Sequence, residues 1–417
     1  KLRFKKSKVS VSDMLWEIDP LGHVAFDSTG LTVNKMAIQN EWQKFSLNGR
    51  LGKNSSDILN ISLHKFNVDN FNMLLHRTGL TLGGSVTGTA HIRALYGPMS
   101  FLSDLQLDSL MLNHHLIGSG RINNEWIANE SAISIDAHLK HDGIDGLLIN
   151  GKYFPQSNEN NYKLNVAFNG LPVSAFEHYV EKIISGLEGS ASADFRVSGK
   201  TDSPILNGMV MLDSAKLHVN YLNTDFVVND TIGVGANGFT MVDATVSDIY
   251  GSKGSISGFL HHTGFKDWNF DATATINNVF AMNTGPSHNS LYYGKGFASG
   301  VVRFSGKPGD IFMDMALKTE RGTRFHIPLY GAETVSESDF ITFVSPNSDE
   351  PDDELDQKYK VDLSGLTMNF DMELTPEAEV QLIFDQKSGD IMKGQGTGDI
   401  KMKLDRLSGF KMFVDYV

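Results

Sequence analysis

The chain contains no cysteine among its 417 residues, and only 11 residues are proline. The missing cysteines exclude disulfides, thiolate metal ligands and cysteine nucleophiles. The chain also lacks any run approaching the ~20 consecutive apolar residues of a membrane-spanning helix, and no signal peptide opens it. Because the first residues and the final "FKMFVDYV" both have strand-like sequence, we interpret residues 1–417 as a segment of a longer protein.

An excess of basic residues is missing too. The chain has 36 Lys and Arg against 49 Asp and Glu, which gives a net charge of −13. A nucleic-acid-binding protein needs a basic stripe whose contacts release counterions from the phosphates. We therefore exclude nucleic acid as a partner.

Signatures of catalysis and of metal binding are also absent. His114–His115 and His261–His262 are adjacent pairs in strand-like sequence, where neighbouring side chains point to opposite faces. Neither pair is therefore predicted to chelate one metal ion. The sequence has no zincin-type histidine pair, nucleophile elbow or phosphate-binding loop. We predict that the protein is not an enzyme and has no catalytic residue, metal site or cofactor.

The sequence is rich in glycine and in strand-forming residues. Its 40 glycines accompany Val, Ile, Thr and Phe throughout, and apolar residues alternate with polar ones over many stretches. Alternation with a period of two indicates a β-sheet with one apolar face, and glycine within strands indicates bulges and bends. We predict an all-β, mostly antiparallel fold with a few short helices.

One short motif recurs along the chain: an apolar residue, a small polar residue, glycine, any residue and a second apolar residue. Its copies are "LNGRL" (47–51), "INGKY" (149–153), "ISGFL" (256–260) and the weaker "LSGLT" (363–367). The glycines of these copies stand 102, 107 and 107 residues apart. We therefore predict one continuous repetitive segment over 1–417. Its approximate repeat units are 45–148, 149–255, 256–362 and an incomplete 363–417.

Each of the first three repeats is predicted to have one short helix, and the fourth is predicted to lack one. The clearest candidate is "LPVSAFEHYVEKIISG" (171–186), in which Ser174 is a candidate cap and Gly186 a terminator. Its apolar side chains recur at spacings of three and four and are predicted to cover a sheet end; they are Phe176, Tyr179, Val180 and Ile183. Weaker candidates are residues 68–76 and 278–283. The acidic stretch 345–357 is predicted to be a solvated loop.

The apolar residues of the alternating stretches are predicted to share one inner face. They are Leu59, Ile61, Leu63, Leu164, Val166, Phe168, Phe195, Val197, Phe270, Ala272, Ala274, Val380, Leu382, Phe384, Ile400, Met402 and Leu404. Their neighbours are predicted to face solvent, because successive strand residues point to opposite faces; these are Ser62, Asn165, Asp271, Gln381 and Lys403. The pattern fits both a closed β-sandwich core and an open groove that holds an apolar ligand.

Four stretches together resemble the TamB family of the AsmA-like superfamily. They are "GSISGFLHHTGFKDWNFDATATINNVFAMNT" (254–284), "YYGKGFASGVVRFSG" (292–306), "TERGTRFHIPL" (319–329) and the C-terminal stretch 375–417, which starts "TPEAEVQLIFDQ". The resemblance is strongest from about residue 186 onward. The N-terminal membrane helix and the extreme C-terminal segment that are usual in the family are missing from this sequence.

The resemblance implies a fold and a function. Proteins of this family form an elongated, twisted, taco-shaped β-sheet with an apolar groove, in the periplasm of a Gram-negative cell envelope. The parent protein would be anchored in the inner membrane, and membrane contact would be made through the missing termini. A BamA-like outer-membrane barrel would bind regions outside this segment. The implied cargo is phospholipid, whose acyl chains the groove would carry between the two membranes in support of outer-membrane homeostasis.

Two alternatives remain open on the sequence alone. One is a periplasmic chaperone that assists the assembly of outer-membrane barrels by strand addition at a sheet edge. The other is a structural β-rich envelope or surface protein with a closed core. Crosslinking of the inner face in cells distinguishes transport from chaperone activity, because the first captures phospholipid and the second captures nascent barrel strands.

The expected elongation can be measured in solution. One strand and turn per ~12 residues gives roughly 35 strands. Stacked about 4.8 Å apart, these strands would extend on the order of 100–170 Å. A compact chain of this length would instead have a radius of gyration of about 22 Å. We expect small-angle scattering to give a clearly larger radius, and the compact value would contradict the elongated groove.

Overall fold

A computed structural model of the protein describes most of the chain. The described residues are 1–11, 14–54, 56–72, 80–93, 100–181, 183–264, 266–289, 292–328, 365–385, 390–405 and 409–416. They divide into two compact units. Unit 1 comprises 1–176, 190–211 and 234–236, and unit 2 comprises 177–189, 212–233 and 237–417. The acidic stretch 345–357 lies outside the described residues.

Strands make up most of both units. Up to the end of β13, the strands are β1 Leu2–Arg3, β2 Ser7–Val11, β3 Met14–Ile18, β4 His23–Asp27, β5 Gly30–Gln39, β6 Lys44–Gly52, β7 Ile58–Asn67, β8 Leu82–Arg93, β9 Ser100–Leu112, β10 His115–Ile127, β11 Ala132–His141, β12 Ile144–Tyr153 and β13 Tyr162–Pro172. Beyond β13, they are β14 Ile184–Lys200, β15 Ser203–Val219, β16 Thr224–Val228, β17 Thr231–Gly235, β18 Gly238–Asp248, β19 Lys253–Thr263, β20 Lys266–Thr284, β21 Tyr293–Lys307, β22 Asp310–Thr319, β23 Arg324–Pro328, β24 Leu366–Leu374, β25 Glu379–Asp385, β26 Asp390–Gln395, β27 Gly398–Asp405 and β28 Gly409–Tyr416.

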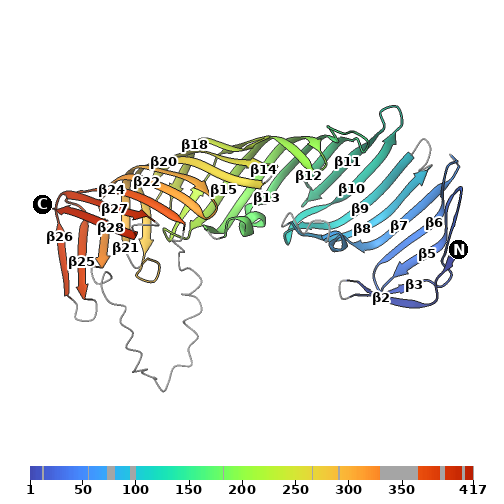
Figure 1. The fold of residues 1–417 in the computed structure, drawn as a ribbon, viewed down its shortest axis with the longest axis horizontal. Helices are drawn as coiled ribbons and strands as arrows, with labels where there is room; N and C mark the ends of the chain where they lie inside the picture. Colours follow the sequence, from blue (N-terminus) through green and yellow to red (C-terminus); the bar gives the residue numbers. More distant parts are fainter. Residues whose placement is uncertain are drawn as a thin grey trace, which may run out of the picture. The chain divides into compact units, whose positions relative to one another are not determined.

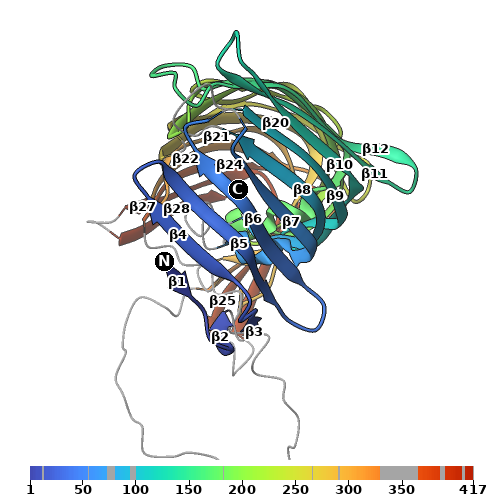
Figure 2. The ribbon, with the colours of Figure 1, turned by 90° about the vertical axis from the view of Figure 1, so that its right-hand side faces the viewer.

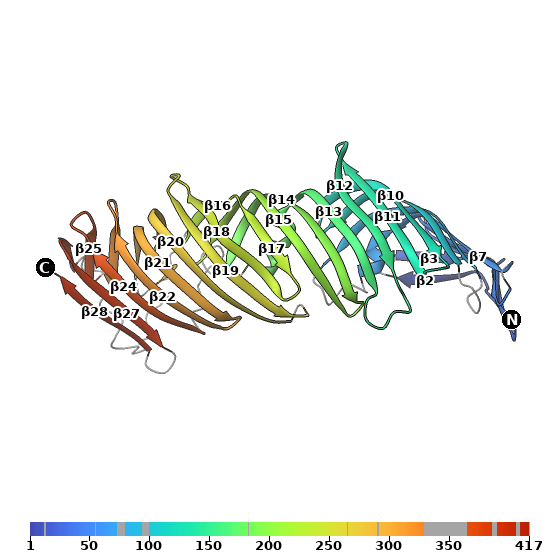
Figure 3. The ribbon, with the colours of Figure 1, turned by 90° about the horizontal axis from the view of Figure 1, so that it is seen from above.

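Neighbouring strands pair antiparallel almost throughout. In unit 1, β5 to β13 pair one after another in chain order, and the same holds for β18 to β22 in unit 2 (Figures 1 and 3). The two parallel pairs are β22 with β24 and β23 with β25. The predicted all-β, mostly antiparallel class is therefore confirmed. The repeat boundaries stay a prediction.

The described helical segments are two short 3₁₀ helices. They are η1, Val68–Phe71, and η2, Val173–Tyr179. The prediction that Tyr179, Val180 and Ile183 cover a sheet is wrong, because these side chains are 51%, 36% and 54% exposed. The predicted helix at 278–283 is wrong as well, since those residues belong to β20. Among the described residues, no helix has the length and hydropathy needed to cross a membrane.

Bulges interrupt the strand ladders of both units. Seven of the strand residues with left-handed backbone, φ between 44° and 67°, mark these bulges, and six of the seven lie at a shift in pairing register. They are Lys35, Lys65, Ser109, Gly170, Ser214, Asp243 and Asn278. A bulge bends its strand and increases the local twist. Figure 2 shows the strongly curved strands of each unit.

Each of these bulge residues donates its backbone N–H to a small polar side chain on the next strand. The acceptors are Asn48, Thr87, Ser119, Ser192, Asn229, Ser257 and Ser299. Six of the seven distances, all except that to Asn229, lie between 2.8 and 3.2 Å. The bond provides a partner for an N–H that the bulge removes from the ladder.

The recurrent sequence motif is explained in part by these bonds. Asn48 and Ser257 are the small polar residues of "LNGRL" and "ISGFL", and each precedes a motif glycine. Glycine also follows Thr87, Ser119 and Ser299. A Cβ at Gly300, where φ is +142°, would lie 2.2 Å from the carbonyl oxygen of Ala316 on the neighbouring strand. Glycine therefore allows two curved strands to approach closely.

The sheet of unit 2 divides at β21. Residues Ala298–Lys307 of β21 pair with β22, whereas Tyr293–Lys295 pair with β23. One branch continues from β22 through β24 and β27 to β28, and the other continues from β23 through β25 to β26. The chain crosses from the first branch to the second at two corners, residues 320–323 and 375–378, and it returns from β26 to β27 at residues 396–397. Strands that change sheets at such corners fold one layer over the other.

Hydrogen bonds join the two corners. The backbone N–H of Thr375 donates to the Thr319 hydroxyl at 2.9 Å, and the Thr375 hydroxyl donates to the Thr319 carbonyl at 3.1 Å. Both threonines are buried. The N–H of Glu379 donates to the carbonyl of Thr323 at 2.9 Å. β22 and β24 run side by side into the two corners, and β23 and β25 run side by side out of them. Both pairs of strands are therefore parallel.

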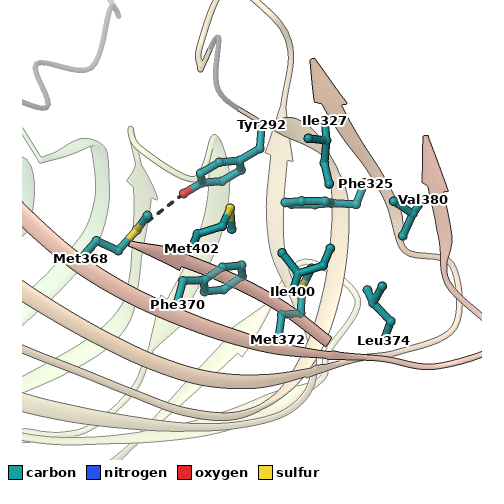
Figure 4. Close-up of a cluster of buried hydrophobic side chains, with 10 residues drawn as sticks. All are labelled: Tyr292, Phe325, Ile327, Met368, Phe370, Met372, Leu374, Val380, Ile400 and Met402. Carbon is teal, nitrogen blue, oxygen red and sulfur yellow. Dashed lines mark hydrogen bonds between the residues drawn. The ribbon is translucent and has the colours of Figure 1, made fainter. Parts of the chain in front are cut away.

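A packed hydrophobic core lies between the two branches. Its side chains are 6% exposed or less and face one another in Figure 4; they are Tyr292, Phe325, Ile327, Met368, Phe370, Met372, Leu374, Val380, Ile400 and Met402. Tyr292 shares a hydroxyl hydrogen bond with Tyr221 and donates to the sulfur of Met368. Burial raises the pKa of Tyr292 well above its usual value, and that of Tyr221 is raised by burial too. Both side chains therefore enter the core uncharged.

The close approach of backbone at Gly300 predicts that adding a single methyl group there lowers the stability of the fold. We expect Gly300→Ala to lower the free energy of unfolding by about 2–4 kcal/mol, because the added Cβ meets backbone. The matched control is Gly309→Ala, since Gly309 also has positive φ but open space around a Cβ. The control should cost about 1–2 kcal/mol for the left-handed backbone alone. Equal losses in urea denaturation would contradict the steric explanation.

The packed core also predicts that substitutions at two neighbouring residues of β27 differ in their effect on stability. Ile400 is fully buried and its neighbour Lys401 is exposed. We expect Ile400→Ala to destabilise unit 2 by about 2–5 kcal/mol through lost burial and the cavity that remains. Lys401→Ala should change stability by less than ~0.5 kcal/mol. Hydrogen exchange of the β24 and β27 amides measures both effects. Unchanged protection in the Ile400 variant would mean that the two branches do not enclose a core.

Candidate functional site

Three rows of side chains cross unit 1 on one face of its sheet, each row following the pairing register from strand to strand. Row A is Phe66, Val86, Leu107, Gly120, Leu139, Leu147, Phe168 and Ala193. Row B is Phe45, Leu63, Gly88, Leu105, Ile122, Ala137, Ile149, Val166 and Phe195. Row C is Leu47, Ile61, Ala90, Ser103, Asn124, Ile135, Gly151, Leu164 and Val197. We call the side that carries these rows the apolar face.

Burial differs between the two faces of unit 1. On β7, Leu59 is buried and Ile61 and Leu63 are half-buried, whereas Asn60 and Ser62 between them are exposed. The apolar face is covered most completely beside η1, where Val68 packs on Val86, Leu107, Ala137 and Leu139. Farther along, on β13 and β14, the row side chains Leu164, Val166, Phe168, Phe195 and Val197 remain half-buried. This part of the apolar face retains access to solvent, which is costly for apolar side chains.

Unit 2 continues the same construction on its own strands. Row D is Met241, Gly258, Ala272, Phe304, Met313, Met368 and Leu404. Row E is Ala244, Ile256, Ala274, Val302, Met315, Phe370, Met402 and Met412. Row F is Gly254, Ile276, Gly300, Leu317, Met372, Ile400 and Val414. The rows run from half-buried positions on β19 to β22 into the packed core at β24 and β27.

Charged side chains lie on the opposite face. Lys152 and Glu130 form an ion pair at 2.6 Å, and Lys318 and Glu373 form one at 3.3 Å. The sequence neighbours Asn165, Asp271 and Lys403 are exposed, in agreement with their predicted direction. Among the described residues, no cluster of three or more His, Asp or Glu could hold a metal ion. The rows A to F therefore offer dispersion and burial to a ligand, without charge.

The sequence-predicted lining residues fall into three environments. Those of β7, β13, β14 and β20 lie on the apolar faces of their units, mostly half-buried, and Phe168 contacts Phe195 with ring centroids 5.8 Å apart. Val380, Ile400 and Met402 lie in the packed core, with Leu382 and Leu404 packed against it. Phe384 is 47% exposed at a shift in the pairing register near the end of β25. Whether these residues line a groove stays a prediction.

One neighbour departs from the expected alternation. Gln381 is 7% exposed, so the prediction that it faces solvent is wrong. Val380 and Ile383 lie on opposite faces of β25 and are 6% and 3% exposed, so both faces of this strand are covered. The Gln381 amide donates to the carboxylate of Glu379. Alternation predicts which residues share a face, but the exposure of each face depends on what packs against it.

The methionines of unit 2, apart from Met402, are the part of the site that the sequence reasoning missed. Seven of the 16 methionines belong to the packed core or lie against it; they are Met282, Met313, Met315, Met368, Met372, Met402 and Met412. The signal was present as alternation in "FMDMAL" and "TMNFDMEL". Methionine is flexible and polarisable, so it fills irregular space between packed layers.

The comparison with known proteins gives one family match. Residues 243–413 match the model of the TamB C-terminal domain. No curated protein and no solved structure matches the chain. The matched residues include all strands from β19 to β27 and therefore most of rows D, E and F.

The match agrees with the geometry of these rows and with the resemblance seen in the sequence. TamB proteins are non-enzymatic components of the translocation and assembly module. They reside in the periplasmic part of the cell envelope and act with an outer-membrane partner in the assembly of outer-membrane proteins. Residues 243–413 of this chain are therefore similar to the TamB C-terminal domain.

Proposed function

We propose that the apolar faces of this chain line a groove that carries phospholipid acyl chains between the inner and outer membranes. The observation that supports this proposal is the set of half-buried apolar side chains on β13 and β14, in register with one another across neighbouring strands. A protein that used this face only as its own core would bury these side chains. An acyl chain that covers them completes the burial.

The energetics suit transport along the rows. Each methylene kept out of water contributes about 0.8 kcal/mol, so an acyl chain is strongly held by any apolar surface of sufficient length. Rows A, B and C present apolar side chains on each successive strand, with glycine at three positions and one polar pair in row C. Movement from one strand to the next therefore needs no large change in free energy. Headgroups would remain in water at the open side.

The packed core of unit 2 limits where the proposal applies. Side chains of β23 and β25 already cover rows D, E and F at β24 and β27. A lipid cannot share that space unless the two branches separate. The proposal therefore assigns acyl contact to the half-buried row positions on β6 to β14 and on β19 to β22, and leaves out the cluster that Val68 covers. The alternative of a closed structural core describes the section between the two branches.

The cellular setting of the proposal comes from the family. The parent protein is inferred to be anchored in the inner membrane and to reach a BamA-like outer-membrane barrel through regions outside this segment. The net charge of −13 gives no overall attraction to the headgroups of anionic lipids. The cargo contact is therefore assigned to the acyl chains.

Strand addition at β26 is the second candidate function. Within the described part of the chain, β26 pairs on one side only, with β25. Ile391 and Met392 on this strand are 42% and 60% exposed. An exposed apolar edge strand can accept an extended segment from another protein, as a chaperone of outer-membrane barrels would require. Crosslinking from Met392 to protein, and from Phe168 to lipid, would separate the two functions.

A charge on the apolar face tests the transport proposal. Phe168→Glu would place a carboxylate between rows of apolar side chains, where a passing acyl chain must desolvate it at a cost of several kcal/mol. We expect lipid transfer or outer-membrane integrity in cells to be lost while the melting temperature changes little. The matched control is Asn165→Glu, three residues away on the exposed face of the same strand, which should leave transfer unchanged.

The other outcomes are equally informative. If the face is a packed core, Phe168→Glu should cost about 3–5 kcal/mol of stability, and the melting transition should collapse. Normal transfer together with normal melting would rule out both the groove and the core. Loss of transfer in the Asn165→Glu control would show that the assay responds to charge anywhere on β13.

A further inference from the structure

Rows A to F contain one pair of polar residues. Every position in these rows is apolar or glycine except Ser103 on β9 and Asn124 on β10, which lie opposite each other in row C. The Asn124 amide donates to the Ser103 hydroxyl at 2.8 Å. Ser103 is 2% exposed, whereas Asn124 is only half-buried. The serine therefore fixes the orientation of an amide that remains accessible on the apolar face.

The hydrogen-bonding capacity of this amide is only partly used. Among the described residues, the bond to Ser103 is the one hydrogen bond of the Asn124 side chain. A primary amide has two N–H donors and an oxygen with two acceptor positions. The oxygen and the second N–H are therefore available to a ligand. A purely apolar ligand placed over Asn124 would leave them unpaired, which opposes binding.

The surroundings of the pair select the kind of polar group that would fit. Ala90 and Ile135 flank it in row C, and Leu105 and Ile122 lie beside it in row B. The charged neighbours Asp104, Arg121 and Glu125 are exposed on the other face. A charged headgroup would thus find no countercharge here. A neutral group with strong acceptor oxygens, attached to long apolar chains, satisfies both the amide and the rows.

Aromatic side chains extend the site on one side. Phe101 and Trp126 stand two residues from Ser103 and Asn124 along their strands. Tyr153 and Tyr162 follow on the same face two strands farther on, with ring centroids 5.4 Å apart. Amphipathic aromatic rings favour the boundary between apolar and wet regions. Across the apolar face, the apolar side chains of row B are therefore followed by the amide of Asn124 in row C and then by the aromatic side chains.

We propose that Asn124, positioned by Ser103, forms a subsite that hydrogen-bonds the ester carbonyl of a diacyl phospholipid. The two acyl chains lie along the half-buried side chains of rows B and C, and the headgroup extends past the aromatic side chains toward water. This inference rests on the proposed lipid groove and adds to it a preferred resting position for the glycerol backbone. The second N–H of Asn124 donates to the ester carbonyl, and no covalent step is involved.

Ester and ether lipids provide the test, because an ether-linked lipid has the same chains and headgroup without the carbonyls. The purified chain is incubated with vesicles that contain equal amounts of dioleoyl phosphatidylethanolamine and its dialkyl ether analogue. Bound lipid is then counted by mass spectrometry. We expect the wild-type chain to be enriched in the ester form by about threefold to tenfold, as for one neutral hydrogen bond. Asn124→Leu should reduce the ratio to about one.

Two further variants separate binding from folding. Ser103→Ala frees the amide from its partner and should lower the enrichment without removing Asn124. Asn123→Leu changes the exposed neighbour on β10 and should keep the wild-type ratio. A wild-type ratio of one with lipid bound would overturn the subsite while the lipid groove stands. Persistent enrichment in a folded Asn124→Leu variant would also overturn it. Absence of both lipids from the wild-type chain would refute the groove and the subsite together.

Discussion

The hydrogen bond between a left-handed bulge residue and a small polar side chain on the next strand is the interaction on which this structure depends. It recurs seven times, from Lys35 with Asn48 to Asn278 with Ser299. A left-handed non-glycine residue costs about 1–2 kcal/mol, and its unpaired N–H would add to that cost. The side-chain acceptor offsets part of this cost and thereby stabilises the curvature. A flat sheet would present the same rows without enclosing anything.

Each bulge also changes which residues face inward. Leu63 and Phe66 both lie on the apolar face although they are an odd step of three positions apart, because the bulge at Lys65 inserts one residue. The same step of three occurs between Phe168 and Leu171 and between Ile276 and Val279. Without the bulge, the alternation would place the second residue of each pair on the wet face. The bulge, which this hydrogen bond stabilises, thus bends the strand and also moves the apolar residues from even to odd positions, or the reverse, along it.

This shift of the alternating pattern at each bulge explains which elements could be predicted from the sequence. Within an uninterrupted strand, alternation correctly placed Leu59, Ile61 and Leu63 on one face, with Ser62 on the other. Residues 278–283 were predicted to be helical from their place in the repeat, whereas Ile276 and Val279 flank a bulge within β20. The repeat motif was visible in the sequence, but the role of its polar residue was not. That role depends on a partner 10 to 22 residues away.

The sequence could not distinguish the accessible rows from the packed core for a different reason. Alternation on β13 and on β24 is the same, yet Phe168 is half-buried while Phe370 is 6% exposed. The difference arises at the two corners, where Thr319 and Thr375 hold strands that bend from one branch into the other. The bend brings β23 and β25 over the rows, where their side chains bury Phe370 and its neighbours. Methionine is concentrated there because two layers that meet at a corner leave irregular space, which a flexible side chain fills better than a branched one.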